Sequence, residues 1–188
     1  MLVPVHRGNI VKPREAAAAP TVEFPSAESG LWTLVMTGLD SHLQSEDKQV
    51  NSIKLKIFVD QTAKFRGHFH HLHACLLQYL HWMVTNIRGG DLSTGDLVCD
   101  YLQPFPALGT GYHRYTFVLY RQEAPLHLPR LAEEPGSVNL EARTFHSAEF
   151  YKEHQEVITP AGLGFFQSDY DSTIRDFFHH KLDMREPR

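Results

Sequence analysis

Four segments of the chain carry the apolar patterns of β-strands. Leu31 to Thr37 (LWTLVMT) is almost wholly apolar, and Leu80 to Ile87 (LHWMVTNI) is a second core-like run. Such runs are typical of strands that are covered on both faces of a sheet. His113 to Tyr120 and Gly162 to Gln167 read as two further strands. The pattern therefore predicts a β core built on these four segments.

Helical signals are fewer and lie mainly near the C-terminus. Ser147 is an expected N-cap for a short helix that ends near His154. Ser172 is expected to cap a last helix with an apolar stripe, formed by Ile174, Phe177, Phe178 and Leu182. Strands outnumber helices and do not alternate with them regularly. The expected class is mainly β, a sandwich or large sheet with peripheral helices.

Several shorter segments complete the pattern. Thr21 to Phe24 is a short strand candidate, and Ile53 to Val59 alternates like a half-buried edge strand with lysines on one face. His68 to Gln78 has apolar residues at roughly helical spacing, and Gly38 to Lys48 reads as a polar loop. We expect Thr159 and Pro160 to break the first helix before the strand at Gly162 to Gln167.

Composition limits the class of protein. The 188 residues, 42% hydrophobic and 21% charged, suffice for one globular domain with a core. The net charge of −4 argues against a large general surface for nucleic acid, and no apolar run reaches the roughly 20 residues that span a bilayer. Cys75 and Cys99 are the only cysteines, so we expect no disulfide framework and a reducing compartment.

The two ends look truncated. The first twenty residues form neither a signal peptide nor a convincing transit peptide, and the C-terminal DMREPR stops without a cap or tail. We therefore expect residues 1–188 to be a single domain and a fragment of a longer protein.

The motif GTGYHRY, from Gly109 to Tyr115, is the most suggestive of chemistry. Gly109 and Gly111 allow sharp turns or a close approach to a bound group. His113 and Arg114 follow at the start of a strand, where they can hold an anion or form a structural salt-bridge corner. The residues alone leave both interpretations open.

Other candidates favour structural roles. His68, His70, His71, His73 and Cys75 include zinc-ligand types, but neither strand nor helix spacing closes a tetrahedral set, so no metal site is predicted. Ser93 reads as a turn residue, without the surroundings of a hydrolase nucleophile. Phe105, between two prolines, is equally compatible with loop packing and with anchoring a partner. The remaining candidates are expected to be helix caps or solvent-exposed residues: Asp169, Asp171, Asp176, His179 and His180.

HWMVTNI, followed by GGDLSTGDLVCDYLQPFPALGTGYHRYTFVLYRQ, resembles the phosphatidylethanolamine-binding protein (PEBP) family. The resemblance covers most of the chain from about Gly8, apart from residues near 49–78. It implies a large antiparallel sheet packed on a smaller one, with C-terminal helices and a site for a phosphate-like anion. The site histidines would be His81 and His113, with Tyr115 on the wall. Asp40 would lie beside them. By the two-residue period of a strand, Arg114 should point the other way, where a structural pair with Asp40 is favoured over ligand binding.

The departures from this family concern the site itself. The family motif Asp-Pro-Asp-x-Pro reads here Gly38, Leu39, Asp40, Ser41, His42, so Gly38 replaces a site carboxylate. Phe178 stands where the family offers a tyrosine hydroxyl. Each lost hydrogen bond to a charged ligand costs about 1.5–3 kcal/mol. Together the losses predict binding weaker by at least roughly a hundredfold, so a small-molecule ligand is not expected to bind tightly.

The segments TGLDSHL, HQEVITPAGLGFF and KLDMREP resemble the branch of the family that belongs to the mitochondrial large (39S) ribosomal subunit. This resemblance implies a non-enzymatic structural protein of the mitochondrial matrix, without cofactor or metal. Its expected partners are mitochondrial ribosomal proteins and large-subunit rRNA, with no membrane or DNA. Contacts with RNA are expected at local basic spots such as Lys12–Arg14 or Arg185 and Arg188. The alternative is a PEBP-type module that binds a phosphate or phospholipid head group or acts as a regulator.

One segment matches neither branch. Asp40 and His81 are 81 − 40 = 41 positions apart, and the surplus is approximately residues 50–78. It is expected to be either a genuine insertion or an artefact of gene modelling.

Overall fold

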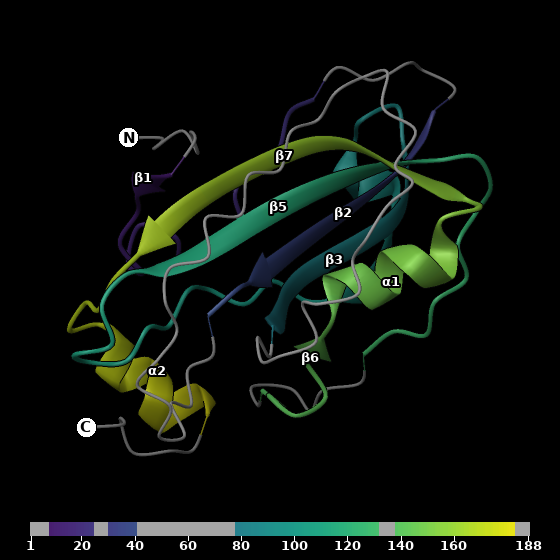
Figure 1. Ribbon diagram of the computed structural model, residues 1–188. Coiled ribbons are helices and arrows are strands. Elements are labelled where there is room, and N and C mark those ends of the chain that lie inside the picture. Colours follow the sequence, from purple (N-terminus) through teal and green to yellow (C-terminus); the bar gives the residue numbers. More distant parts are fainter. Residues whose placement is uncertain (1–7, 25–29, 41–77, 132–137, 183–188) are drawn as a thin grey trace.

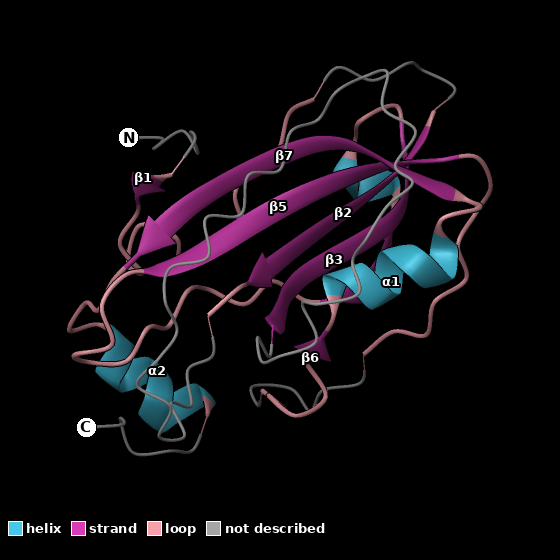
Figure 2. Cartoon of the chain, viewed as in Figure 1, coloured by secondary structure: helices cyan, strands magenta, loops and turns pink. Residues whose placement is uncertain are grey.

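A single β-sheet dominates the fold of the computed structural model, which describes residues 8–24, 30–40, 78–131 and 138–182 (Figures 1 and 2). The sheet has seven strands in the order β1-β7-β5-β2-β3-β4, with β6 also paired to β3. The strands are β1 (Asn9–Ile10), β2 (Leu31–Gly38), β3 (Gln78–Arg88), β4 (Asp96–Cys99), β5 (His113–Gln122), β6 (Thr144–Phe145) and β7 (Ile158–Ser168). All pairings are antiparallel except that of β1 with β7. The mainly β prediction is confirmed.

β2 lies inside the sheet, between β3 and β5, as its unbroken apolar run predicts. Trp32, Leu34 and Met36 enter one hydrophobic cluster, and Val35 enters another on the opposite face. Because both faces are covered, seven of the eight residues of β2 are buried. Burial on two faces explains why this strand shows no apolar–polar alternation.

The two α-helices flank the sheet. Their N-caps are His146 and Thr173, each one residue from the predicted Ser147 and Ser172, and neither makes a side-chain capping hydrogen bond. Helix α1 (Ser147–His154) packs Phe150 into the cluster that contains Val35. Helix α2 (Ile174–Lys181) lies at the end of the sheet where β5 begins (Figure 1). Its buried Ile174 and Phe178 join Leu102, Phe105 and Ala107 in a third cluster. The predicted apolar stripe is thus confirmed.

Four details differ from the sequence-based expectation. The described residues form one seven-stranded sheet, whereas the resemblance implied a second, smaller one. β4 had not been expected as a strand. Thr21 to Phe24 is not a strand. Its apolar residues Val22 and Phe24 pack their side chains against the core. Thr159 and Pro160 belong to β7, next to an irregularity in its pairing with β5.

Some expectations lie outside the described residues. They include the strand Ile53 to Val59, the histidine-rich segment and nearly all of the unmatched residues 50–78, of which only Gln78 is described, as the first residue of β3. Among the described residues, no helix is long and apolar enough to cross a membrane.

Candidate functional site

Three site positions predicted from the sequence meet on adjacent strands. Gly38 ends β2 and pairs with Tyr115 of β5 and with Tyr79 of β3. A Cβ atom added to Gly38 would lie 3.0 Å from Nε2 of His81 and 3.4 Å from Cε1 of Tyr115. A side chain at position 38 therefore points directly at His81. The glycine removes the group that would otherwise touch this imidazole.

His81 is fully buried, and its surroundings fix its protonation. Nδ1 lies 2.8 Å from the carbonyl oxygen of Leu102, which can only accept, so Nδ1 carries the hydrogen. Burial lowers the pKa of His81 to about 4, against the opposing effect of the Leu102 carbonyl. At neutral pH the ring is neutral, and its Nε2, directed towards Gly38, is an acceptor. A neutral acceptor does not attract an anion.

Aromatic rings surround His81. Tyr115 meets it edge-on with ring centroids 5.0 Å apart, and the Tyr115 ring stacks on Phe166 at 5.2 Å. Burial strongly raises the pKa of the Tyr115 phenol, partly offset by the backbone at Phe105. The phenol is therefore neutral at every physiological pH. This wall of the site carries no charge.

His113 lies two residues before Tyr115 on β5, and thus on the same face of the sheet. Its Nε2 is 2.6 Å from the hydroxyl of Thr110, and that hydroxyl is 2.8 Å from the carbonyl oxygen of Ala107. Because the hydroxyl donates to the carbonyl, His113 donates through Nε2. Burial lowers the pKa of His113, although Asp40 opposes the shift. The second site histidine is also biased towards the neutral form.

Asp40 and Arg114 form the salt-bridge corner. Arg114 donates from Nη2 to Oδ1 of Asp40 at 2.6 Å, from Nε to Oδ2 at 3.1 Å, and from its backbone amide to Oδ2 at 2.7 Å. This is the bidentate geometry of an arginine–carboxylate pair. The guanidinium of Arg114 is ion-paired with Asp40. This pairing favours the structural interpretation of the motif over anion binding by Arg114.

The two loop glycines are required by backbone conformation. Gly109 and Gly111 have φ values of +80° and +78°, in the left-handed region that other residues rarely adopt. None of the described atoms lies within 4 Å of a Cβ built on either residue. The glycines therefore shape the turn before β5, and a close approach to another group is not needed to explain them.

The remaining site position, Phe178, belongs to an apolar cluster. Its ring lies edge-on to Phe105 with centroids 6.2 Å apart, and Phe105 in turn is 5.5 Å from the ring of His81. Phe105 is fully buried, so loop packing is right and the partner-anchor interpretation of this residue is wrong. The side of the site that faces α2 is aromatic.

Several groups that define this environment were not predicted. The Leu102 carbonyl, Thr110 and Phe166 have no signal of their own in the sequence. Arg143, 1% exposed, donates to the carbonyl oxygens of Leu80 and Asp100 and lowers the pKa of His81 further. A buried arginine in an irregular segment cannot be distinguished from a surface one by pattern alone.

Comparison with known proteins identifies the family and similar folds. Residues 15–159 match the family model described as phosphatidylethanolamine-binding protein. Among solved structures, the fold is similar to that of carboxypeptidase Y inhibitor in complex with its proteinase, at 16% identity and a TM-score of 0.57 over 89% of this chain and 78% of that one. It is also similar to the solution structure of CG7054, at 25% identity and a TM-score of 0.55 over 90% and 80% of the two chains. A phosphatidylethanolamine-binding protein from Plasmodium vivax matches at 17% identity and a TM-score of 0.54, over 89% and 80%.

Proposed function

The chain belongs to the phosphatidylethanolamine-binding protein family, and from this premise we propose that it is a structural constituent of the mitochondrial large ribosomal subunit with a degenerate anion site. The segments TGLDSHL, HQEVITPAGLGFF and KLDMREP, which resemble the mitoribosomal branch, support the role. In this role the protein lies in the mitochondrial matrix, needs no cofactor and catalyses no reaction. It supports translation by bridging its neighbours in the subunit.

The observation that carries the proposal is the contact at residue 38. An anion site needs donors aimed at one point, and here the carboxylate that would help to protonate His81 is replaced by hydrogen. His81 faces that position with an acceptor, because its pKa is about 4. Asp40 is engaged by Arg114, and Phe178 is packed on Phe105. A family member that has lost its ligand chemistry while keeping its core is suited to a scaffolding role.

The charges favour protein neighbours over RNA. Lys12 pairs with Asp169 at 2.6 Å, and Arg14 pairs with Asp171 at 3.4 Å. The Lys12–Arg14 segment, expected from the sequence as a local RNA contact, is therefore already neutralised within the chain. Arg185 and Arg188, the other expected contact, lie outside the described residues. Ribosomal proteins are thus the main partners in this proposal, with rRNA contacts limited to local points.

Depletion of the protein tests this role. Cells lacking it should accumulate less 39S subunit in gradient sedimentation and should translate less in the matrix. Re-expression of the Gly38→Ala variant should restore both, because a methyl group at position 38 supplies no ligand chemistry. Normal 39S particles and normal matrix translation after depletion would contradict the proposal.

The second candidate is a PEBP-type binding or regulatory module. It is favoured by one observation: His81 and Tyr115 remain in ring contact, and His113 shares a face with Tyr115. Calorimetry with inorganic phosphate and with phosphatidylethanolamine head-group analogues distinguishes the two roles. Tight binding by the unmodified chain would favour the module, and absent or weak binding would favour the scaffold.

A further inference from the structure

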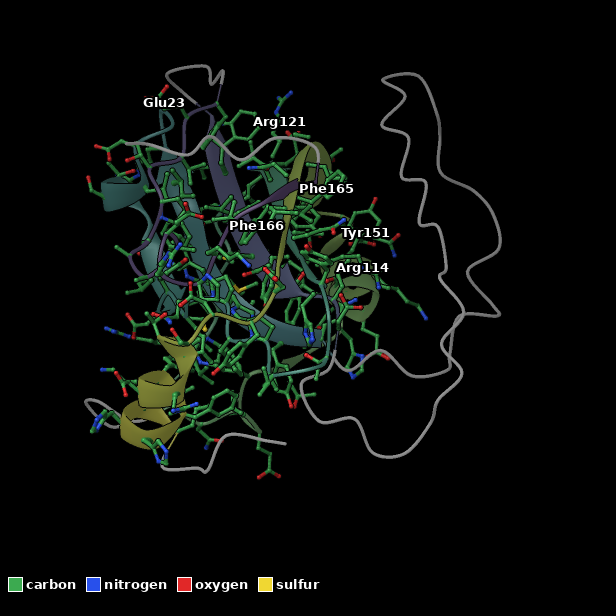
Figure 3. All side chains as sticks on the ribbon, turned by 90° about the vertical axis from the view of Figure 1, so that its left-hand side faces the viewer. Glu23, Arg114, Arg121, Tyr151, Phe165 and Phe166 are labelled. Carbon is green, nitrogen blue, oxygen red and sulfur yellow. The ribbon has the colours of Figure 1, made fainter. Side chains whose placement is uncertain are left out.

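Arg143 is the only buried arginine among the described residues, and 1% of it is exposed. Figure 3 shows a more usual position for an arginine: Arg121 lies at the surface, and 61% of its side chain is exposed. Burial of a charged group is costly unless the group is hydrogen-bonded. The hydrogen bonds of Arg143 therefore show which parts of the fold it organises.

The guanidinium of Arg143 joins two segments that lie next to His81. Its Nη1 donates to the carbonyl oxygen of Leu80 at 3.0 Å and to that of Asp100 at 3.1 Å. Leu80 directly precedes His81 on β3, and its amide donates back to the carbonyl oxygen of Arg143 at 2.8 Å. Asp100 directly follows β4. A single nitrogen atom of Arg143 thus connects β3 to the segment 100–102.

This segment ends at the residue that holds the ring of His81. The amide of Leu102 donates to the carbonyl oxygen of His81 at 2.7 Å, and the carbonyl oxygen of Leu102 accepts from Nδ1 of His81 at 2.8 Å. Asp100 lies only two residues before Leu102. Because Arg143 fixes Asp100 to the residue before His81, it limits the movement of the Leu102 carbonyl relative to the imidazole.

The Leu102 carbonyl determines which nitrogen of neutral His81 carries the hydrogen. A carbonyl oxygen only accepts, so the hydrogen is on Nδ1 and Nε2 is left as an acceptor. Nε2 is the atom that faces position 38, since a Cβ atom added to Gly38 would lie 3.0 Å from it. An anion needs a donor at this point. The tautomer of His81 therefore sets the polarity of the candidate site.

The charge of Arg143 acts in the same direction as its hydrogen bonds. Burial is the largest cause of the low pKa of His81; the Leu102 carbonyl opposes it, and the positive charge of Arg143 lowers the pKa further. Two positive charges repel each other more strongly inside a protein than in water. Arg143 thus disfavours the imidazolium, the one state of His81 with a donor on both nitrogens.

We propose that Arg143 is a positioning residue of the candidate site, which holds Leu80 and Asp100 together, keeps the hydrogen of His81 on Nδ1 and so presents an acceptor to position 38. The inference rests on the degenerate site in the proposed function and not on the ribosomal role. It adds a second cause of the degeneracy, besides the carboxylate that Gly38 lacks. The tautomer is measured without a ligand, so failure of this inference is distinguishable from failure of the proposed function, which ligand binding and subunit assembly test.

Nitrogen NMR of the full chain with isotope-labelled histidine measures the tautomer at neutral pH. In the unmodified chain, His81 should carry its hydrogen on Nδ1, and this hydrogen should exchange slowly with solvent. In Arg143→Met the Leu102 carbonyl is less restrained, so the exchange should become at least about tenfold faster and the Nε2–H tautomer should appear. Arg143→Lys keeps a charged donor and should retain more of the Nδ1–H tautomer than Arg143→Met does.

Arg130→Met is the matched control. Arg130 also binds Asp100, through the carboxylate at 3.0 Å, but 62% of the Arg130 side chain is exposed. Its loss should leave His81 unchanged, because Arg143 still holds the Asp100 carbonyl. Equal exchange in Arg143→Met and in the unmodified chain, or an Nε2–H tautomer in the unmodified chain, would overturn the proposal.

A measurement on the unmodified chain keeps the proposal testable if both Arg143 variants unfold. The carbonyls of Leu80 and Asp100 should hinder rotation of the Arg143 guanidinium, so its Nη hydrogens should give separate NMR signals. Those of the exposed Arg130 should average. An averaged signal for Arg143 would overturn the proposal, because a rotating guanidinium cannot hold the two carbonyls together.

Discussion

At the residue scale, the hydrogen atom that serves as the side chain of Gly38 determines the chemistry around His81. The space next to Nε2 is too small for a further side chain without a slight shift, since a Cβ would lie at 3.0 Å. Without a carboxylate there, burial is the largest influence on the charge of His81, and its pKa falls to about 4. The loss of one side chain therefore changes a donor into an acceptor.

Restoring the carboxylate should reverse this effect. In Gly38→Asp, the charged form of His81 gains a partner, and the pKa of His81 should rise well above 4. Combined with Phe178→Tyr, the change should recover measurable affinity for phosphate. Histidine proton shifts in NMR report the pKa, and calorimetry reports the affinity. Gly38→Asn is the matched control without charge. An unaltered His81 pKa in Gly38→Asp would show that residue 38 does not face the imidazole.

The buried neutral state of His81 also predicts how stability depends on pH. An unfolded histidine titrates near 6.5, whereas His81 in the folded chain titrates at about 4. Between these values the unfolded state binds more protons, so the free energy of unfolding falls as the pH falls from about 6.5 to about 4. The full effect is on the order of 3 kcal/mol.

His81→Asn removes this titration and retains a side-chain amide near the Leu102 carbonyl. Urea unfolding at several pH values should show a shallower loss of stability in acid for this variant than for the unmodified chain. His127, which is exposed, offers a control substitution to Asn. Parallel curves for His81→Asn and the unmodified chain would mean that His81 titrates normally.

At the element scale, a buried polar cluster joins the end of β3 to the end of β5. Asn86, at a left-handed φ of 56°, exchanges hydrogen bonds with Gln122, Leu126 and Asp96. Gln122 also accepts from the hydroxyl of Thr33 at 2.7 Å. The cluster satisfies the polar groups of three strands at a point where the sheet turns into loops.

Asn86→Asp should be strongly destabilising although it preserves shape. The Asn86 side-chain amide donates to the Leu126 carbonyl at 2.8 Å and to Asp96 at 2.6 Å. A carboxylate there would face two acceptors, and an unsatisfied buried charge costs about 3 kcal/mol or more. Urea unfolding measures the loss, and Gln155→Glu, on an exposed side chain, is the control. A loss below about 1 kcal/mol would show that the cluster is not important for stability.

The predictability of the elements follows from how each one is covered. β2 and the core of β3 were evident because burial on both faces leaves a continuous apolar run. β4 was missed because only its last two residues, Val98 and Cys99, are buried. Pro160 was interpreted as a breaker because proline lacks a ladder donor, but β7 is an edge strand at that point and tolerates it.

The sequence predicted which residues form the site, but it did not predict their protonation states. The motif located His81, His113 and Tyr115, since strand periodicity places the last two on one face. Burial depth and the carbonyl at Leu102 set the pKa of His81, and both depend on loops whose paths leave no periodic signal. The Asp40–Arg114 pair was foreseen because Arg114 had to point away from the site.

At the scale of the whole molecule, internal ion pairs engage much of the described basic charge. Lys12, Arg14, Arg114, Arg121 and Arg130 each pair with a carboxylate. The net charge of the chain is −4. Over the described residues, these pairs reduce the positive charge that is available to phosphates.

RNA binding by this chain should accordingly be weak and only slightly salt-dependent. Each phosphate neutralised adds about 0.7–0.9 to the slope of log affinity against log salt, so we expect a slope shallower than about −2. Fluorescence anisotropy with a labelled single-stranded RNA measures the slope. Asp169→Asn, which releases Lys12, should steepen it. A steep slope for the unmodified chain would show a cationic RNA surface.

The most direct test of the central claim is co-sedimentation of the full-length protein with mitochondrial large subunits in a sucrose gradient. A tagged protein expressed at its natural level should migrate with the 39S peak, and it should remain there in Gly38→Ala, since the degenerate site is not needed for assembly. Recovery only at the top of the gradient or with membranes would contradict the account, and it would favour a ligand-binding module.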